Sequence, residues 1–364
     1  MNGSLTVLGL ESSCDDTAAS VVSQQAGQQA LVRSSIVHGQ GDLHLEFGGI
    51  VPEVAARAHS IRLDHAAEQA LEEAGLRLDE LDAIAVTAGP GLIGGLIAGM
   101  AFAEGLAAGS GKPLIAINHL AAHALTIRMA DAVRFPYLAL LASGGHCQFL
   151  AVHGSDSFIR LGGTIDDAPG EAFDKSARIL GLGQPGGPAI EQSALSGDPQ
   201  CFRLPRPLSG KQGCNMSFSG LKTSLLRTVE GLQSAGQLTE DTVSDLCAGF
   251  QQAVADVLAE KTCTALEMFA SRFGEPRALA ICGGVAANHR IRGSLENLCI
   301  KHGLGFHAPA LHYCTDNGAM VAWAAIERLR DGCVTGEAIR ARPRWPLDMA
   351  SDPLVGSGRK GPKS

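Results

Sequence analysis

The order of apolar segments repeats once along this chain, and the repeat limits the possible folds more than any other feature. The first half opens with three apolar runs that we interpret as β-strands, at residues 5–10, 18–22 and 31–37. The elements predicted after them are a helix at 52–74, a strand at 83–87, a helix from residue 92 and a strand at 114–117. The second half repeats this order, with strands at 137–142, 148–152 and 158–161 and then alternating helices and strands up to a helix from residue 316.

Repeated α/β halves predict two similar domains that face each other across a ligand cleft. The length of 364 residues agrees, because it exceeds what one hydrophobic core usually serves. We predict domains at 1–131 and 132–324, with an insertion at about 182–240 that does not fit the repeat. A C-terminal helix at about 325–345 is expected to pack back on the first domain.

The chain after Arg340 is rich in Arg, Pro and Gly and is expected to be loose, with residues 346–364 forming a flexible tail. The N-terminus lacks the basic region and long apolar core of a signal peptide. Residues 92–108 are strongly apolar but contain several glycines and Glu104, so we interpret them as a buried helix and not a membrane span. The ten cysteines include no C-x-x-C pair, which favours reduced thiols in a soluble, cytoplasmic protein without membrane contact.

The charge of the chain limits how it could act on nucleic acid. A net charge of −8 is atypical of a protein that binds nucleic acid alone, because such proteins are normally basic. A local patch or a partner would have to supply the charge. Residues 199–229 carry five basic residues and no acidic one, namely Arg203, Arg206, Lys211, Lys222 and Arg227. An exposed basic loop without a ligand explains this stretch equally well.

A metal site is indicated by two histidines directly after the strand at 114–117. His119 and His123 are four residues apart on a predicted helix, so both imidazoles lie on one face and could share a divalent ion. Two surface or core histidines are the alternative. We seek the third ligand at Asp316, for which capping of the next helix is an equally plausible role. Two His and one carboxylate are typical of non-haem iron, and zinc also accepts them.

Three turns that follow strands suit a phosphate-bearing ligand, at residues 11–17, 143–146 and 283–288. Their free backbone N–H groups and small side chains favour anions, although ordinary hairpins also use glycine and none matches the P-loop or dinucleotide motif. A fourth stretch, residues 162–175, places several carboxylates and a lysine before a helix. We expect some of them to face a ribose or a metal, where an acidic helix start is the simpler explanation.

Together these residues resemble the TsaD family of tRNA threonylcarbamoyltransferases, formerly described as glycoproteases. The resemblance extends over about residues 5–325. It is carried by residues 11–17, 87–91, 118–123, 143–146, 162–175, 185–188, 218–223, 283–288 and 313–320. It implies an actin-like α/β fold of two ribonuclease-H-like domains. Departures are Asp16, Cys147 and Ala121, where the family usually has Glu, Thr and often Glu.

The resemblance also implies a reaction and its site. Threonylcarbamoyl would pass from threonylcarbamoyl-AMP to N6 of the adenosine next to the anticodon, at tRNA position 37, in tRNAs that read ANN codons. The family's metal ligands, usually of Fe2+, match His119, His123 and Asp316. Its substrate-binding positions match Leu141, Ala142, Ser143, Gly144, Gly145, His146, Asp174, Gly187 and Asn288. A TsaB-like dimerisation partner and a TsaE-like ATPase are implied, with a TsaC-like enzyme making the adenylate.

For catalysis we predict Asp15 and Glu11, both in the first turn. The donor is an activated mixed anhydride, so no protein nucleophile is required, and a bound metal would act as a Lewis acid. Asp15 would handle the proton of the amine or orient the adenine. A turn-forming aspartate is the alternative.

Three other functions fit the sequence less well. A zinc metalloprotease is disfavoured, because the residue after the first histidine is Leu120 and not the required Glu. A non-catalytic nucleotide-binding scaffold of the actin-like class would have no use for the metal ligands. A sugar kinase of the same fold would not need them either.

Overall fold

We describe the protein from a computed structural model that covers residues 3–47, 49–131, 133–332, 339–352 and 354. These residues form two compact units. The N-terminal unit lies within Met1–Arg134, His153–Ser157 and Thr315–Met349. The C-terminal unit lies within Phe135–Val152, Phe158–Cys314 and Ala350–Ser364. The domain limits and the cleft proposed from the sequence stay predictions.

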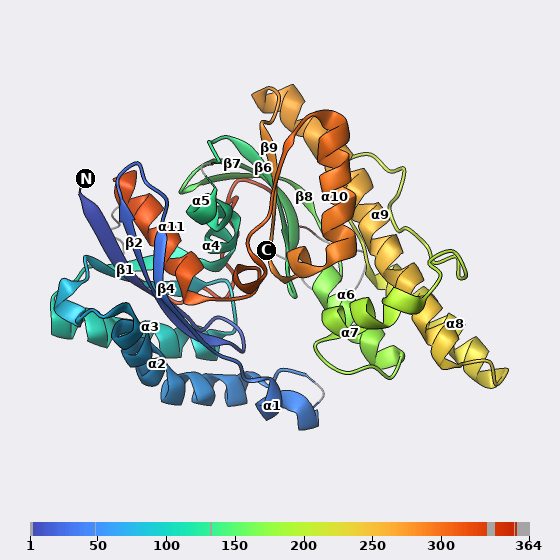
Figure 1. The fold of residues 1–364 in the computed structure, drawn as a ribbon, viewed down its shortest axis with the longest axis horizontal. Helices are drawn as coiled ribbons and strands as arrows, with labels where there is room; N and C mark the ends of the chain where they lie inside the picture. Colours follow the sequence, from blue (N-terminus) through green and yellow to red (C-terminus); the bar gives the residue numbers. More distant parts are fainter. Residues whose placement is uncertain (1–2, 48, 132, 333–338, 353, 355–364) are drawn as a thin grey trace. The chain divides into compact units, whose positions relative to one another are not determined.

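The N-terminal unit is built on a five-stranded mixed sheet in the order β3-β2-β1-β4-β5. Figure 1 labels three of its strands, β1, β2 and β4. Its strands are β1 (Ser4–Glu11), β2 (Thr17–Gln25), β3 (Leu31–His38), β4 (Ala83–Gly89) and β5 (Leu114–Asn118). The first three are antiparallel neighbours, whereas β4 and β5 run parallel to β1. Parallel strands end at one edge of the sheet, so the residues after β1, β4 and β5 come together there.

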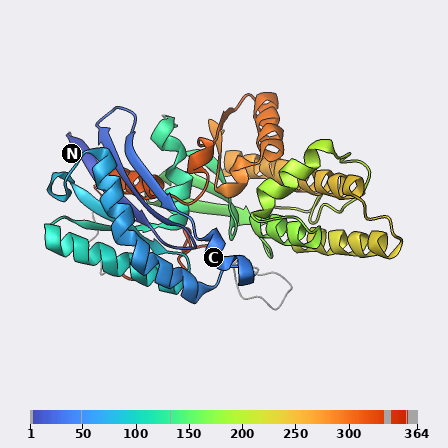
Figure 2. The ribbon, with the colours of Figure 1, turned by 60° about the horizontal axis from the view of Figure 1, so that its bottom comes forward.

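Helices cover both faces of this sheet. Alternate residues of β1 point to opposite faces, and Leu8 and Leu10 face a core formed with α2 (Pro52–Ala74) and α3 (Ile93–Ser110). Figure 2 shows these two helices side by side. On the other face Gly9 lies against α11 (Gly318–Arg330), since a Cβ at Gly9 would be 2.2 Å from the carbonyl oxygen of Gly318. The shorter helices of this unit are α1 (Gly41–His44), α4 (His119–Leu125) and α5 (Ile127–Ala130).

The C-terminal unit repeats this strand order, because its sheet reads β8-β7-β6-β9-β10 from the corresponding edge. Its strands are β6 (Tyr137–Ala142), β7 (Cys147–Gly154), β8 (Ser157–Gly163), β9 (Ala278–Cys282) and β10 (Gly305–His307). Its helices are α6 (Pro169–Ile179), α7 (Gly186–Ser193), α8 (Ser219–Ser234), α9 (Glu240–Phe273) and α10 (His289–His302). The stretch predicted as an insertion contains α7 and α8, and their Ile190, Leu221 and Leu225 are buried in the core of this unit. Because the two sheets share one strand order, the repeat predicted from the sequence is confirmed.

The C-terminal segment differs from the expectation. Helix α11 is the helix predicted from residue 316, and it ends at Arg330. Of the separate helix expected at about 325–345, residues 339–345 are not helical. The segment after Arg340 is also not loose, because Ala341 and Trp345 pack against the core of the N-terminal unit and the Arg342 N–H donates to the Ala88 carbonyl over 2.7 Å. Residues 333–338, 353 and 355–364, part of the predicted helix and tail, lie outside the described residues.

Helix α3 is long and apolar enough to cross a membrane by length and composition, with a mean hydropathy of 1.3. Its contacts are those of a helix in a layered α/β unit, because it packs on α2 and on the turn after β1. Gly91, Gly95 and Gly99 permit this close approach. A Cβ at Gly95 would be 2.2 Å from the Ser12 carbonyl oxygen, and one at Gly99 would be 2.1 Å from Ser12 Oγ. Only 33% of the helix is buried, so the prediction of a buried helix is wrong. Its glycines instead let one face of the helix approach the first turn closely.

We expect Gly99→Ala and Gly105→Ala to shift stability in opposite directions. The added methyl of Gly99→Ala has no space beside Ser12 and should lower the free energy of unfolding by about 1–3 kcal/mol. Gly105 lies in the same helix, and a Cβ there would meet no atom within 4 Å, so Gly105→Ala should raise it by about 0.5–1 kcal/mol. Urea denaturation measures both. Equal effects of the two variants would contradict the close approach of α3 to the turn.

Candidate metal centre

The histidine helix begins directly at the end of β5, because Asn118 caps it. Asn118 Oδ1 accepts hydrogen bonds from the N–H groups of Leu120 and Ala121 at 2.9 and 3.3 Å. Its Nδ2 donates to the carbonyl oxygen of Trp345 at 2.8 Å, so the C-terminal segment holds the cap in place. His119 and His123 follow as the first and fifth residues of α4, both buried.

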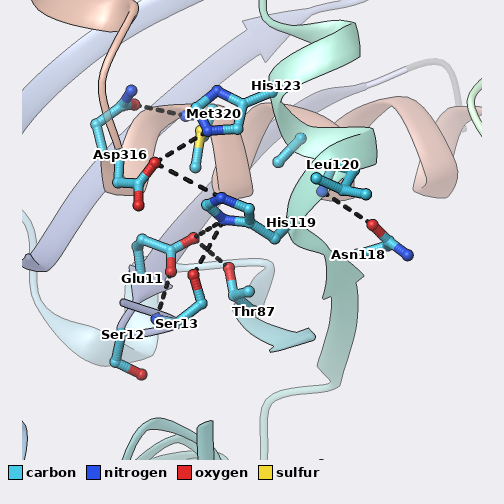
Figure 3. A network of polar contacts seen from close by, with 12 residues as sticks. Glu11, Ser12, Ser13, Thr87, Asn118, His119, Leu120, His123, Asp316 and Met320 are labelled. Atoms are coloured by element: carbon cyan, nitrogen blue, oxygen red, sulfur yellow. Dashed lines mark hydrogen bonds and ion pairs between the residues drawn. The ribbon is translucent and has the colours of Figure 1, made fainter. Parts of the chain in front are cut away.

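Asp316 joins the two histidines from the chain just before α11. Asn317, and not Asp316, caps that helix: its Oδ1 accepts from the Met320 N–H at 2.9 Å. The helix-capping alternative for Asp316 is therefore wrong. The carboxylate instead lies beside both imidazoles, as Figure 3 shows. The three residues predicted as metal ligands are thus brought together from segments almost 200 residues apart.

The spacing of the three ligand atoms is close to that around one metal ion. Asp316 Oδ1 is 3.0 Å from His123 Nε2 and 3.6 Å from His119 Nε2. Ligand atoms about 2.1 Å from an ion, in tetrahedral or octahedral geometry, lie about 3.0–3.4 Å from one another. Among the described residues, these three side chains form the group of His, Cys, Asp or Glu whose ligand atoms all lie within 4.8 Å of one another. The cluster could hold a divalent ion.

The opposite nitrogen of His119 is held by the turn after β1. His119 Nδ1 lies 3.0 Å from Glu11 Oε2 and 3.1 Å from Ser13 Oγ (Figure 3). The carboxylate of Glu11 is fully buried and also accepts from the Ser13 N–H and the Thr87 hydroxyl, both at 2.6 Å. A carboxylate on Nδ1 keeps the proton there and leaves Nε2 as the electron-pair donor, which is the usual arrangement of a metal-bound histidine.

The site carries an excess of negative charge. Burial alone would lower the pKa of His119, but Asp316 and Glu11 outweigh it and raise the pKa to about 9. The pKa of Asp16 rises to about 7, first because the group is buried and then because Asp15, Asp316 and Glu11 repel its negative charge. Several carboxylates around two histidines favour a cation in their midst.

We expect metal affinity to depend steeply on pH. A metal must displace the proton of His119 in the metal-free protein, so affinity should rise about tenfold per pH unit up to about pH 9 and then level off. With an ordinary histidine pKa the plateau would begin near 6.5. Titration with Zn2+ between about pH 7 and 8.5 measures the slope. A flat profile in that range would contradict the raised pKa.

The residues predicted to bind substrate from the C-terminal unit lie around the turn between β6 and β7. The Ser143 N–H donates to the His146 carbonyl over 2.8 Å, which closes the turn. The start of α6 reaches it, because the N–H groups of Gly170 and Glu171 donate to the carbonyls of Ser143 and Gly144 over 3.3 and 3.1 Å. Leu141 and Ala142 are fully buried in β6.

Gly283, Asp174 and Asn288 have local roles beside this turn. Gly283 has a φ of 90°, and a Cβ there would lie 2.5 Å from the Ala142 carbonyl oxygen, so the turn after β9 touches the end of β6. Asp174 Oδ1 accepts from the Gly186 N–H at 2.8 Å, which places Gly187 next to that contact. Asn288 caps α10 by accepting from the Ile291 N–H at 3.0 Å. The substrate-binding roles of these residues, and of Gly145, stay predictions.

The acidic stretch at 162–175 is largely occupied within the protein. Asp166 caps α8, accepting from the Phe218 N–H at 2.8 Å, and Asp167 contacts Lys175 and Lys222 at 3.1 and 3.3 Å. The expectation that these two carboxylates face a ribose or a metal is not supported. Asp166 instead stabilises the start of α8, and Asp167 forms ion pairs with two lysines.

Sequence reasoning missed the contacts made by Ser13 and Thr87, and the raised pKa of Asp16. The stretches 11–17 and 87–91 were both singled out, but no pattern in either shows that Glu11 and Thr87 meet. That β1 and β4 are parallel neighbours is the signal that could have indicated it.

Known proteins similar to this chain agree with the geometry. The family described as TsaD, tRNA N6-adenosine threonylcarbamoyltransferase, matches residues 31–323. A protein of that name from Cereibacter sphaeroides is 59% identical, and one from Ruegeria pomeroyi 58% identical, each over 100% of both chains. Among solved structures, HypF of T. kodakarensis superposes with a TM-score of 0.59 at 17% identity, over 92% of this chain and 48% of that one. The actin-like α/β fold class predicted from the sequence is confirmed.

Proposed function

The chain belongs to the TsaD family of tRNA N6-adenosine threonylcarbamoyltransferases, and we propose that its His119, His123 and Asp316 hold the metal ion used in this transfer. It is an acyltransferase that acts on tRNA and forms threonylcarbamoyladenosine. The single observation that supports the metal role is the convergence of these three ligand atoms within 4.8 Å. Two His and one carboxylate favour Fe2+, with Zn2+ as the alternative.

The donor, which we propose to be threonylcarbamoyl-AMP, would bind through its phosphate and adenosine to the turns of the C-terminal unit. The turn at Ser143, Gly144 and Gly145 offers small side chains, and His146 an imidazole, at the start of α6, where the helix dipole favours an anion. Gly187 and Asn288 lie at the starts of α7 and α10, and Asp174 lies within α6. We propose them as the nucleoside contacts.

The reaction requires a group that accepts a proton, but no nucleophile from the protein. N6 of the adenosine, which we place at tRNA position 37 of tRNAs reading ANN codons, attacks the carbamoyl carbon, and the bond from that carbon to the phosphate oxygen breaks, releasing AMP. The proton leaving N6 must be accepted. A bound metal supplies Lewis-acid polarisation. Asp15, half-buried beside Asp16 in the first turn, is the proposed acceptor or adenine-orienting group.

Asp15→Asn should lower kcat by roughly 100-fold while metal content stays at the wild-type level, because general-base catalysis contributes about 10²–10⁴-fold. Threonylcarbamoyladenosine formation is followed by nucleoside mass spectrometry with purified adenylate and tRNA. Asp16→Asn is the control, because it makes the same change at the neighbouring residue. Unchanged turnover in Asp15→Asn would remove that residue from the mechanism.

Glu11, predicted as catalytic, has a different proposed role. Its side chain is fully buried and contacts His119, Ser13 and Thr87. We propose that it is a positioning residue that sets the tautomer and orientation of His119.

The partners remain proposals. An acidic chain that modifies tRNA needs help in binding it, which supports a TsaB-like partner and a TsaE-like ATPase. Ile93 and Ile97, one turn apart on α3, are 48% and 54% exposed, and we propose that they are part of the face that contacts a partner. We propose a cytoplasmic location, where tRNA and adenylate are both present.

The test of the whole proposal is nucleoside mass spectrometry on tRNA from cells depleted of this protein, complemented with wild-type or Asp316→Ala chain. We expect threonylcarbamoyladenosine to disappear and to return only with the wild type. Restoration by the Asp316→Ala variant would favour a non-catalytic scaffold role for the cluster.

A further inference from the structure

A basic groove lies between α9 and α10 in the C-terminal unit, apart from the residues assigned above. Its volume is about 460 Å³. His289, Arg290 and Gln252 line one end, Lys301 and His302 line the other, and Asn297 lies between them. Among the described residues no carboxylate lines it. Its charged lining residues, Arg290 and Lys301, are both basic, which is unexpected on a chain with a net charge of −8.

Helix electrostatics explain only half of these cations. Lys301 and His302 occupy the last turn of α10, where positive charge is favoured by the helix dipole. Arg290 is in the first turn, where the dipole opposes a cation. Cations at both ends of one groove therefore indicate an anion that satisfies both.

The cations differ in how they are held. Arg290 is oriented by Gln252, whose Oε1 accepts from Arg290 Nε at 2.7 Å. Gln252 is itself held by Asp256, which binds Arg206 at 2.7 Å. Lys301 and His302 have no hydrogen-bond or ion-pair partner in the described part of the chain. The groove thus combines a preorganised guanidinium with an unneutralised ammonium.

The length of the groove favours a polyanion over a single small anion. Arg290 and Lys301 are eleven residues apart on one helix, which corresponds to about 16 Å. One phosphate could not contact both. The basic stretch at 199–229 is a weaker candidate, because Arg206 and Lys222 are already paired with Asp256 and Asp167.

We propose that this groove binds the phosphate backbone of the tRNA substrate. The N-terminal end of the groove starts at His289, next to Asn288, so a tRNA held there would continue toward the residues proposed to bind the donor. His289 contributes little charge, since its N–H and ring both contact Glu191, at 2.7 and 3.3 Å. Arg290 and Lys301 are the main contacts.

The test is tRNA binding by the active full-length protein with its partner subunits, using a transcript that reads an ANN codon. Arg290→Glu and Lys301→Glu should each weaken binding roughly tenfold and lower the slope of log affinity against log salt by about 1. The KM for tRNA should rise while kcat at saturating tRNA is unchanged. Lys301→Arg should keep wild-type affinity.

Lys112→Glu is the matched control, because it makes the same charge change on the N-terminal unit, where Lys112 bonds the Asp79 carbonyl. We expect it to bind tRNA normally. An equal loss in this control would show that only net charge matters and would overturn the proposal. Unchanged tRNA affinity of the Arg290→Glu, Lys301→Glu double variant would also overturn the proposal. So would a double variant that no longer binds a partner subunit but keeps its affinity for tRNA.

Discussion

Asp316→Ala should lose the metal ion and nearly all transfer activity while the protein remains folded. Asp316 Oδ1 lies within 3.6 Å of both imidazole nitrogens and would supply the charged ligand of the site. Removing groups that merely orient a ligand typically costs 10–100-fold in metal affinity, so loss of the ligand itself should cost more than about 100-fold. Metal content by mass spectrometry and single-turnover transfer from the adenylate measure the two effects.

The folded state should tolerate this change. Asn317, and not Asp316, caps α11, so the helix keeps its cap. Removing Asp316 also relieves repulsion among the carboxylates of the turn, which should lower the pKa of Asp16 from its value of about 7. Asp79→Asn is the matched control, an exposed carboxylate of the same unit paired with Arg77. Wild-type metal content in Asp316→Ala would refute the site.

Glu11→Gln should weaken metal binding roughly 10–100-fold and change its pH profile. The amide keeps the size of the side chain and can still accept from the Ser13 N–H. Its NH2 group would then face His119 Nδ1, which favours the tautomer with the proton on Nε2, the atom needed by the metal. Loss of the Glu11 charge also lowers the pKa of His119, so the rise of affinity with pH should end below pH 9.

Thr87→Val is the control for this variant. It removes the 2.6 Å hydrogen bond to Glu11 but keeps the carboxylate beside His119. We expect it to lower stability without moving the pH profile. If Glu11→Gln lowered the melting temperature and left both metal affinity and its pH profile unchanged, Glu11 would be a purely structural residue.

The local elements could be predicted from the sequence because each depends on nearby residues. Apolar runs with β-branched residues marked the strands, and the spacing of His119 and His123 placed both on one face of α4. The repeat of that order predicted two α/β units. Gly99, noted only as part of a glycine-rich helix, could not be assigned its neighbour, since Ser12 contacts it from a turn 87 residues away.

The site depended on the sheet. Glu11, Thr87 and His119 lie at or near the ends of parallel strands β1, β4 and β5. This strand order brings the side chains of Thr87 and His119 within 3.0 Å of Glu11, although no local pattern links them. The role of Asp316 was undecided between capping and binding for the same reason, since both roles look alike in the residues around it.

The ligand types, the helix that carries the two histidines and the family could all be predicted from residues close together in the chain. Two further features could not: which carboxylate orients His119, and that the C-terminal segment holds Asn118. Asp316 was predicted as the third ligand, but only the structure excluded its alternative role as a helix cap. These features depend on strand order and on contacts between residues distant in the chain, so they became visible only once the chain was folded.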